Sequence, residues 1–222
     1  MISLKPTYKP SIFIALPNLG VVSTAISIRL LQWMASGKYR IKYYPPENVR
    51  PLDKARNLCH REFLKESYDY LFFLDARVVP PVDALDKLLA ANKDMVSITA
   101  QTIQAFEGEP RLVPVAMKKV DGGYKPHFGT GIERVDVTTC ACTLIKRAVM
   151  EKVGKRAFQF TMTDEWGTEG LSEDFYFCER VRGAGFEIWN DYTQLASHFK
   201  DTDMRTVNEL MRIAYKEGKD NG

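Results

Sequence analysis

Apolar runs of strand length alternate with amphipathic stretches along the first hundred residues. Residues 11–16 and 70–74 are almost wholly apolar, as expected for strands buried on both faces of a sheet. Residues 23–34 instead repeat apolar side chains at helical spacing. Such alternation predicts an α/β fold with a mostly parallel central sheet flanked by helices. The strands predicted in this half are 11–16, 40–44, 70–74 and 94–100, and the helices are 23–34, one beginning at Asp53, and 82–92.

The second of these helices has the clearest start signal. Asp53 is a residue type that caps helix N-termini, and we expect it to do so here. Ala55, Leu58, Cys59 and Phe63 then recur at helical spacing, which predicts the stripe that the helix buries against the sheet.

The pattern changes after residue 100. Short strand-like pieces fill 101–143, where Asp121-Gly122-Gly123 has the composition of a hairpin turn. Polar residues and glycines around Trp166 are typical of a mobile loop. The remaining predictions are a short helix at 146–153 closed by Gly154, a helix from Ser172 as N-cap to about Arg182 that ends in Gly183-Ala184-Gly185, a strand at 186–189 and a final helix.

The chain has the size of one domain. It has 222 residues, of which 45% are hydrophobic, enough for a single full core. No linker, repeat or low-complexity tract divides it. We therefore expect one domain over residues 1–200, with 201–222 as an amphipathic C-terminal helix packed on it. The apolar face of that helix consists of Met204, Val207, Leu210, Met211 and Ala214.

The same properties limit where the protein works. Its longest apolar segments are too short to cross a bilayer, and residues 1–6 lack the apolar core of a signal peptide. A cytoplasmic protein is therefore expected. The net charge is only +3, from 31 basic and 28 acidic residues spread along the chain. This balance requires neither nucleic acid nor an anionic membrane as a partner, and it is compatible with a nucleoside diphosphate ligand.

The four cysteines are better interpreted as buried thiols than as metal ligands or disulfides. They are Cys59, Cys140, Cys142 and Cys178, and no zinc-type CxxC pair occurs among them. The spacing of Cys140 and Cys142 predicts that both side chains lie on one face of a strand.

Acidic residues stand where ligands bind in α/β proteins. Asp75 follows the predicted strand 70–74 directly, and ligands of parallel sheets collect at the carboxyl ends of strands. A carboxylate there can hold a ribose hydroxyl, or a divalent cation that bridges two phosphates. A turn cap is the alternative role for such an aspartate.

A second acidic pair, Glu173-Asp174, opens the helix that follows Ser172. Acids are favourable at a helix N-terminus, so capping alone explains their presence. The pair also follows the loop around Trp166, as expected of an acceptor site, and Asp174 is then placed to act as a general base. We expect Trp166 to stack on the acceptor or on the transferred sugar, with packing beneath the loop as the alternative. His198, together with Asp75, is a candidate metal or diphosphate contact.

In this order the chain resembles a glycosyltransferase of the GT-A fold, similar to glycosyltransferase family 2. The resemblance runs from about Ile12 to His198. It rests on Leu16-Pro17-Asn18 after the first strand, Ala55-Arg56-Asn57, Phe73-Leu74-Asp75, Cys142-Thr143-Leu144-Ile145 before a helix ending Val153-Gly154, Glu173-Asp174 with Arg180 and Gly185, and His198.

The resemblance implies inverting transfer of a sugar from a nucleotide diphosphate donor, such as a UDP- or GDP-sugar, to an acceptor hydroxyl. It implies Asp174 as the general base with Glu173 beside it, and a cation held by Asp75 and His198. Pro17, Asn18, Arg56, Asn57, Asp75 and Arg77 are the candidate donor-binding residues. The acceptor (a glycan, protein, lipid or modified nucleic acid) and the oligomeric state stay open.

One position departs from the family pattern. The family's metal motif is Asp-x-Asp, and here it reads Asp75-Ala76-Arg77. A manganese or magnesium requirement is therefore in doubt. The Arg77 guanidinium can neutralise a diphosphate in place of the metal. Alternatively, the chain is a catalytically impaired module that only binds nucleotide sugars. A nucleotidyltransferase is disfavoured, because Pro17-Asn18-Leu19-Gly20-Val21 lacks that class's glycine- and arginine-rich loop.

Overall fold

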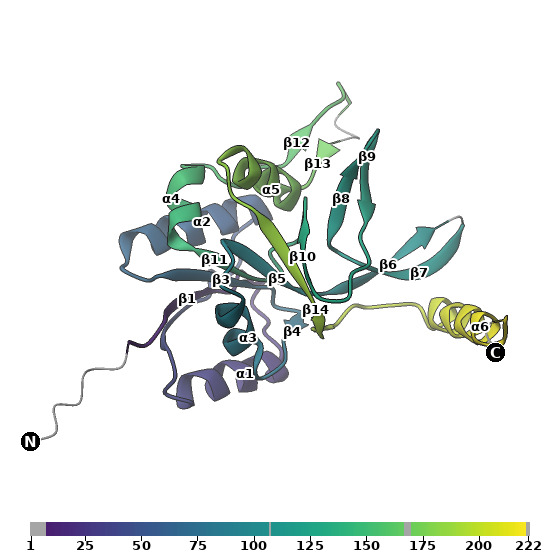
Figure 1. Ribbon diagram of the computed structural model, residues 1–222, viewed down its shortest axis with the longest axis horizontal. Coiled ribbons are helices and arrows are strands. Elements are labelled where there is room, and N and C mark those ends of the chain that lie inside the picture. The colour runs from purple at the N-terminus through teal and green to yellow at the C-terminus, as the bar shows by residue number, and fades with distance from the viewer. Residues whose placement is uncertain (1–7, 107, 167–169, 221–222) are drawn as a thin grey trace, which may run out of the picture.

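A seven-stranded sheet forms the centre of the computed structural model, which describes residues 8–106, 108–166 and 170–220 (Figure 1). Its strand order is β10-β14-β5-β11-β3-β1-β2. Five strands run in the same direction, whereas β11 and β10 run antiparallel to their neighbours. The sheet is thus mostly parallel, as predicted. The strands are β1 Ser11–Ala15, β2 Arg40–Tyr44, β3 Tyr70–Leu74, β5 Met95–Thr99, β10 Ile132–Val135, β11 Cys142–Lys146 and β14 Ile188–Leu195.

Helices cover both faces of this sheet (Figure 1). The side chains of β1 show the reason, because Phe13 and Ala15 enter one core cluster while Ile12 and Ile14 enter the other. One cluster packs under α2, α4 and α5, and the second packs against α1 and α3. These helices are α1 Thr24–Ala35, α2 Leu52–Lys65, α3 Ala84–Ala91, α4 Arg147–Val153 and α5 Glu173–Gly183.

The start and the buried face of α2 differ from the prediction. Pro51, in extended conformation, is the N-cap, and Asp53 lies in the first turn, where its carboxylate accepts from the Lys54 N–H. Proline is suited to this position because it has no N–H to satisfy. Leu58 is only half-buried, and Arg56 is buried instead. The stripe is rotated toward Arg56 because that side chain finds charged partners inside the fold.

Small two-stranded sheets project from the central one. The predicted hairpin turn is confirmed, because β8 Met117–Val120 pairs with β9 Gly123–Pro126 around Asp121-Gly122. The other pairs are β6 Gln101–Phe106 with β7 Glu109–Pro114, β12 Thr161–Met162 with β13 Gly170–Leu171, and β4 Val78–Val79 with β15 Ser197–His198. The last strand of the sheet, predicted at 186–189, begins at Ile188 and continues to Leu195.

The four cysteines are buried and free, as predicted. The prediction that Cys140 and Cys142 share one face of a strand is wrong. Cys140 lies in the turn before β11 and belongs to the core cluster under α2, whereas Cys142 belongs to the cluster under α1. Strand alternation fails here because Cys140 precedes the regular part of the strand.

The C-terminal helix α6, Met204–Asp220, lies beside the β6–β7 hairpin, away from the centre of the sheet (Figure 1). Its contacts are with β7. From Met204 to Lys216 no side chain of α6 is buried, and Val207, Leu210 and Ile213 are half-buried. The division of the chain at residue 200 stays a prediction.

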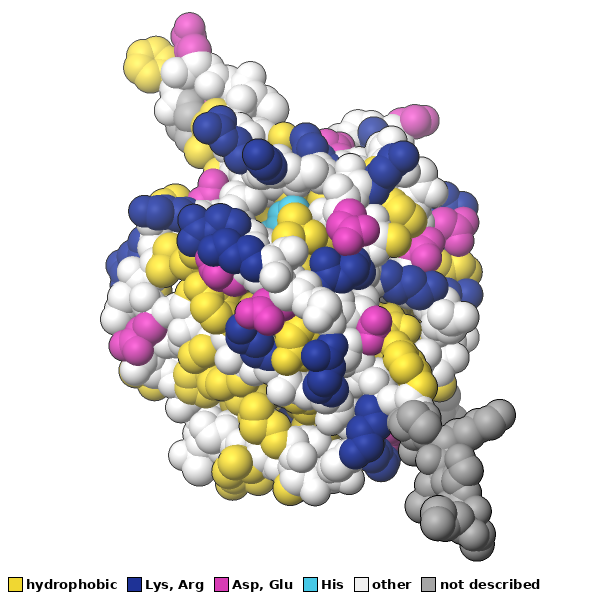
Figure 2. Space-filling model, turned by 90° about the vertical axis from the view of Figure 1, so that its left-hand side faces the viewer, with side chains coloured by type: hydrophobic (Ala, Val, Ile, Leu, Met, Phe, Trp, Pro, Cys, Tyr) yellow, Lys and Arg dark blue, Asp and Glu magenta, His cyan; other side chains and the backbone are white. Residues whose placement is uncertain are grey.

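The surface carries both signs of charge. Lys and Arg side chains are mixed with Asp and Glu side chains over the face shown in Figure 2, as the spread of charge along the sequence predicts. Among the described residues, no helix is both long and apolar enough to pass through a bilayer.

Candidate active site

The candidate site begins where β3 ends. The Asp75 N–H donates to the Ala141 carbonyl at 2.9 Å, which ties this strand end to the turn before β11. The Val78 N–H then donates to the Asp75 carbonyl at 3.0 Å and closes a turn over residues 75–78. The Asp75 side chain keeps 34% of its surface exposed. A carboxylate therefore faces solvent at the carboxyl end of a buried strand, as predicted.

The start of α5 supplies the second and third carboxylates. Ser172 is the N-cap by its extended backbone, although its side chain makes no capping hydrogen bond. Glu173 and Asp174 form the first turn, and both are buried. The N-terminal end of the helix dipole favours this negative charge. Asp174 retains 11% of its side-chain surface exposed.

Arg56, from the middle of α2, joins these carboxylates although it is only 1% exposed. Its Nε lies 3.2 Å from Glu173 Oε1, and its Nη2 lies 3.4 Å from both Asp75 Oδ1 and Asp174 Oδ1. Its Nη1 donates to the Cys140 carbonyl at 3.4 Å. One buried guanidinium thus lies among carboxylates from two separate segments of the chain.

Burial and neighbouring charges shift the pKa values of Arg56 and Asp174. Burial opposes the charge on Arg56, but Asp174 and Asp75 hold the pKa of the guanidinium well above its ordinary value. For Asp174, burial raises the pKa to about 7, with Arg56 acting in the opposite direction and Glu173 and Asp75 adding to the rise. Asp174 therefore holds a proton more strongly than an ordinary aspartate does.

One oxygen of Asp174 is left without a hydrogen bond. The Cys140 N–H donates to this carboxylate, but Oδ1 has no hydrogen-bond partner among the described residues. The contact of Oδ1 with Arg56 is an ion pair at 3.4 Å. A buried acceptor without a donor is costly.

Arg77 and His198 have contacts of their own outside the carboxylate cluster. Arg77 is exposed, and its Nη1 lies 3.9 Å from Asp201 Oδ2. The extended geometry that would place Arg77 on the same side as Asp75 is not observed, because Ala76 and Arg77 form the turn. His198 pairs with Val78 across β15 and β4, and its Nδ1 lies 2.9 Å from the Gln101 carbonyl.

The ligand set for a metal ion is small. Among the described residues, no group of three His, Cys, Asp or Glu side chains is placed to hold an ion. The residues present therefore do not form a metal site by themselves. Magnesium sites in nucleotide enzymes often use one or two carboxylates and complete the shell with phosphate oxygens and water, so Asp75 and His198 would need such additional ligands.

A cavity of about 620 Å³ opens beside the ends of β1 and β2. Pro17 and Asn18, both predicted donor-binding residues, line it. The Asn18 side chain makes hydrogen bonds within its own loop, because its Oδ1 accepts from the Gly20 N–H and its Nδ2 donates to the Leu16 carbonyl. The opposite wall of the cavity was not predicted from the sequence. It consists of Val49, Arg50, Pro51 and Leu52. The prolines after β2 are the only sequence signal that could have indicated a loop there.

Asn57 and Trp166 occupy different surroundings. Asn57 donates to the Phe158 carbonyl at 2.7 Å and accepts from the Phe158 N–H at 3.2 Å, so it fixes the segment after α4. Trp166 is 82% exposed, beyond the β12–β13 pair that precedes α5. It does not pack beneath the loop. Part of the predicted loop, residues 167–169, lies outside the described residues.

Comparison with known proteins agrees at the level of the fold. No protein-family model and no curated protein matches the sequence. Among solved structures, A197 from STIV is similar over 86% of each chain, with a TM-score of 0.59 and 20% identity. GalNAc-T7 with UDP, GalNAc and Mn²⁺ is similar over 90% of this chain, with a TM-score of 0.52 and 11% identity. This chain corresponds to 45% of that structure. The chain adopts the GT-A fold.

Proposed function

We propose that this protein is an inverting glycosyltransferase that uses a nucleotide-diphosphate sugar as donor and Asp174 as general base. The observation that carries the proposal is the carboxylate of Asp174, which is buried, has one oxygen without a hydrogen-bond donor among the described residues and has its pKa raised to about 7. A general base is most effective when its pKa lies near the working pH. The GT-A fold adds support, since the similar GalNAc-T7 structure holds UDP and GalNAc.

In the proposed reaction the acceptor hydroxyl gives its proton to Asp174. Its oxygen attacks the anomeric carbon from the face opposite the diphosphate and forms the new glycosidic bond. The bond between that carbon and the diphosphate oxygen breaks, and the nucleoside diphosphate leaves with the electron pair. One displacement of this kind inverts the anomeric centre.

We assign Arg56 to positioning within this site. Its guanidinium is almost fully buried and forms ion pairs with both Glu173 and Asp174. It reaches Asp75 from the same position. Glu173 then acts as a fixed anion that orients Arg56 and raises the proton affinity of Asp174, rather than as a second base.

The donor would lie between the cavity at Pro17 and the carboxylate of Asp75. The cavity volume is within the range of about 300–1,000 Å³ that small-molecule sites occupy. Its apolar walls suit a nucleobase, and Asp75 and Arg77 lie at the next strand end, where the diphosphate would follow. A divalent cation bound there would neutralise the leaving diphosphate, with Asp75 and His198 as its protein ligands. Arg77 offers a fixed positive charge for the same purpose.

The alternative is a module that binds nucleotide sugars without transferring them. The exposed Arg77 at the second position of the metal motif favours it, because the position usually carries a ligand carboxylate in the family. Incubation with UDP- and GDP-sugars separates the two, since a binding module shows affinity without hydrolysis or transfer.

The first prediction concerns Asp174. Asp174→Asn should lower turnover by about a hundredfold to ten-thousandfold, because it removes a positioned base. In the unmodified protein, turnover should rise with pH through about 7 and level off above it, since the base must lose its proton to act. Rates over pH 5–9 measure both effects. Asp121→Asn, in the hairpin turn, is the control. Equal loss of donor affinity would assign Asp174 to donor binding.

Arg56 should matter for the fold as well as for turnover. Arg56→Met leaves the buried Glu173 and Asp174 without their cation, which typically costs about 3–5 kcal/mol. We expect a large fall in the unfolding midpoint in urea, with partial recovery in Arg56→Lys. Arg61→Met, on an exposed position of the same helix, should be nearly neutral. Stability unchanged in Arg56→Met would disprove the positioning role.

Metal dependence is tested through Arg77. If its charge substitutes for a cation, transfer continues in EDTA, and Arg77→Ala weakens UDP binding by about tenfold to a hundredfold, the equivalent of one charge-assisted contact. Arg134→Ala, an exposed arginine on β10, is the matched control. Should Arg77→Asp instead create manganese-dependent binding and faster transfer, the site has lost a ligand rather than replaced the metal.

Trp166 should affect acceptor use only. Its indole is exposed, so Trp166→Ala should raise the KM for the acceptor and leave the melting temperature within about a degree or two, as for ordinary surface substitutions. Trp33→Ala is the contrasting variant, because Trp33 is 2% exposed and its loss should cost about 3–5 kcal/mol. A comparable fall in melting temperature for Trp166→Ala would place this residue in the core.

A further inference from the structure

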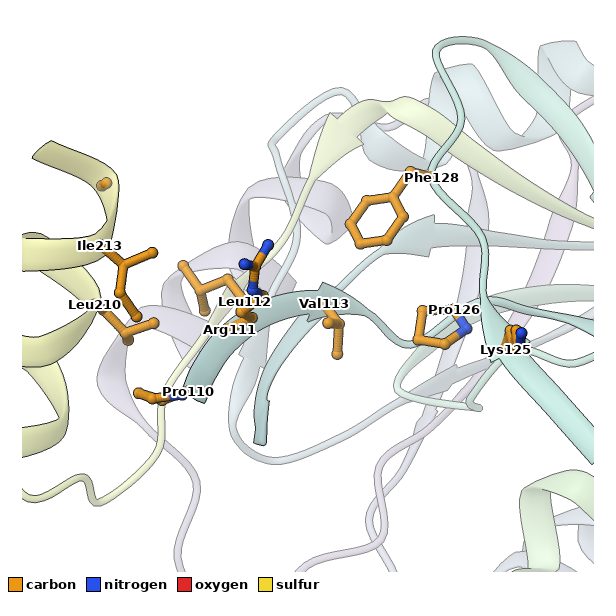
Figure 3. Close-up of a pocket in the computed structure, with 10 residues that line it drawn as sticks. Pro110, Arg111, Leu112, Val113, Lys125, Pro126, Phe128, Leu210 and Ile213 are labelled. Carbon is orange, nitrogen blue, oxygen red and sulfur yellow. The ribbon is translucent and has the colours of Figure 1, made fainter. Parts of the chain in front are cut away.

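A second cavity, of about 530 Å³, separates α6 from β7 and from the chain that follows β9 (Figure 3). Its floor is apolar and is formed by residues of α6 on one side and of β7 and the chain after β9 on the other. Leu210 and Ile213 of α6 face the side of β7 that carries Leu112, and Pro126 and Phe128 continue the surface beyond Val113 (Figure 3). This volume lies within the range of about 300–1,000 Å³ typical of small-molecule sites.

The apolar floor is unusually open to water. Leu112 is 51% exposed and Phe128 is 69% exposed. On α6, Ala214 also lines the cavity and is exposed. Covering exposed apolar surface is favourable, by roughly 25 cal/mol per Å² removed from water. The groove therefore favours a ligand with an apolar body.

The charged side chains described at the groove are positive. Arg111 and Lys125 line it, and no carboxylate does among the residues whose side chains the structure describes. Lys125 also lies directly opposite Lys118 in the β8–β9 ladder, and directly opposed residues share one face of a hairpin. Like charges in directly opposed positions destabilise a hairpin. Among the described residues, neither lysine forms an ion pair that would offset this repulsion.

We propose that this groove binds a single lipid chain that ends in an anionic head group. The chain would lie along Leu112, Phe128 and the apolar side of α6, and the head group would meet Lys125 and Lys118. The anion removes the repulsion between the two lysines while the chain covers the exposed floor. Binding here goes beyond the proposed glycosyl transfer and does not depend on it.

Charge complementarity is the reason to prefer this ligand over a second copy of the chain. A second copy brings a groove edge with the same lysines, so a two-fold contact would place like charges near one another. A neutral apolar ligand would cover the floor but leave Lys118 and Lys125 without a counter-charge. An anionic amphiphile satisfies both parts of the groove.

The test is calorimetric titration of the full chain with dodecyl phosphate below its micelle concentration. Dodecanol and inorganic phosphate are titrated separately as the chain alone and the head group alone. We expect one dodecyl phosphate per protein, bound at least about tenfold more tightly than either fragment, the equivalent of one charge-assisted contact.

Variants locate the site. Lys125→Glu should weaken dodecyl phosphate binding by about tenfold or more. Lys119→Glu is the matched control, because it makes the same charge change on the same hairpin but on the opposite face, beside Tyr124. Leu112→Glu should weaken binding through the floor. Melting curves of all three establish that they fold.

Each contrary outcome overturns the proposal. Equal affinity for dodecanol would show an apolar site without charge recognition. Equal losses in Lys125→Glu and Lys119→Glu would show nonspecific attraction to a basic hairpin. A dimer in light scattering that Leu112→Glu dissociates, together with no binding of dodecyl phosphate, would assign the groove to a second copy. Measuring sugar transfer in parallel keeps this result separate from the proposed function.

Discussion

The buried guanidinium of Arg56 is the interaction on which the candidate site depends. Removing a guanidinium and several carboxylates from water is costly, and their mutual attraction compensates only when the geometry is well satisfied. Arg56 meets that condition with ion-pair contacts to Asp75, Glu173 and Asp174 and a hydrogen bond to the Cys140 carbonyl. It thereby joins the middle of α2, the end of β3, the turn before β11 and the start of α5.

The sheet order explains why these segments meet. β11 lies between β3 and β5 and runs antiparallel to both, so its beginning falls beside the end of β3. The turn that carries Cys140 therefore lies next to Asp75. α5 packs over the same cluster of core residues as α2, and its first turn points its acids at Arg56. Segments distant in sequence thus contribute to one small charged cluster.

The cluster contains more carboxylates than guanidinium groups, and this imbalance favours a proton on one of the carboxylates. Three carboxylates share one guanidinium, and burial raises the pKa of Asp174 to about 7. A site arranged only for stability would pair each carboxylate or replace it with apolar groups. Asp174 Oδ1 has no hydrogen-bond donor among the described residues, and folded proteins keep local conflicts of this kind mainly at functional sites.

The hairpins and α6 at the edge of the molecule are more exposed than the central sheet. α6 lies against β7 and buries none of its side chains between Met204 and Lys216. Exposed apolar and basic groups remain there, around the groove lined by Phe128 and Lys125. Side chains in such peripheral elements can change without disturbing the sheet.

The sequence by itself determined the alternating strands and helices, because period-2 and period-3.6 patterns are local and the core strands are continuously apolar. It also determined that Asp75 ends a strand and that Glu173 and Asp174 open a helix. Only the tertiary structure decided that Arg56 is buried among them, that Cys140 and Cys142 face opposite cores, and that Arg77 lies in a turn. These outcomes depend on contacts between residues far apart in the chain, such as Arg56 and Glu173, and local patterns carry no information about such contacts. For the same reason the sequence did not reveal the groove beside α6, whose walls come from β7, the chain after β9 and the last helix.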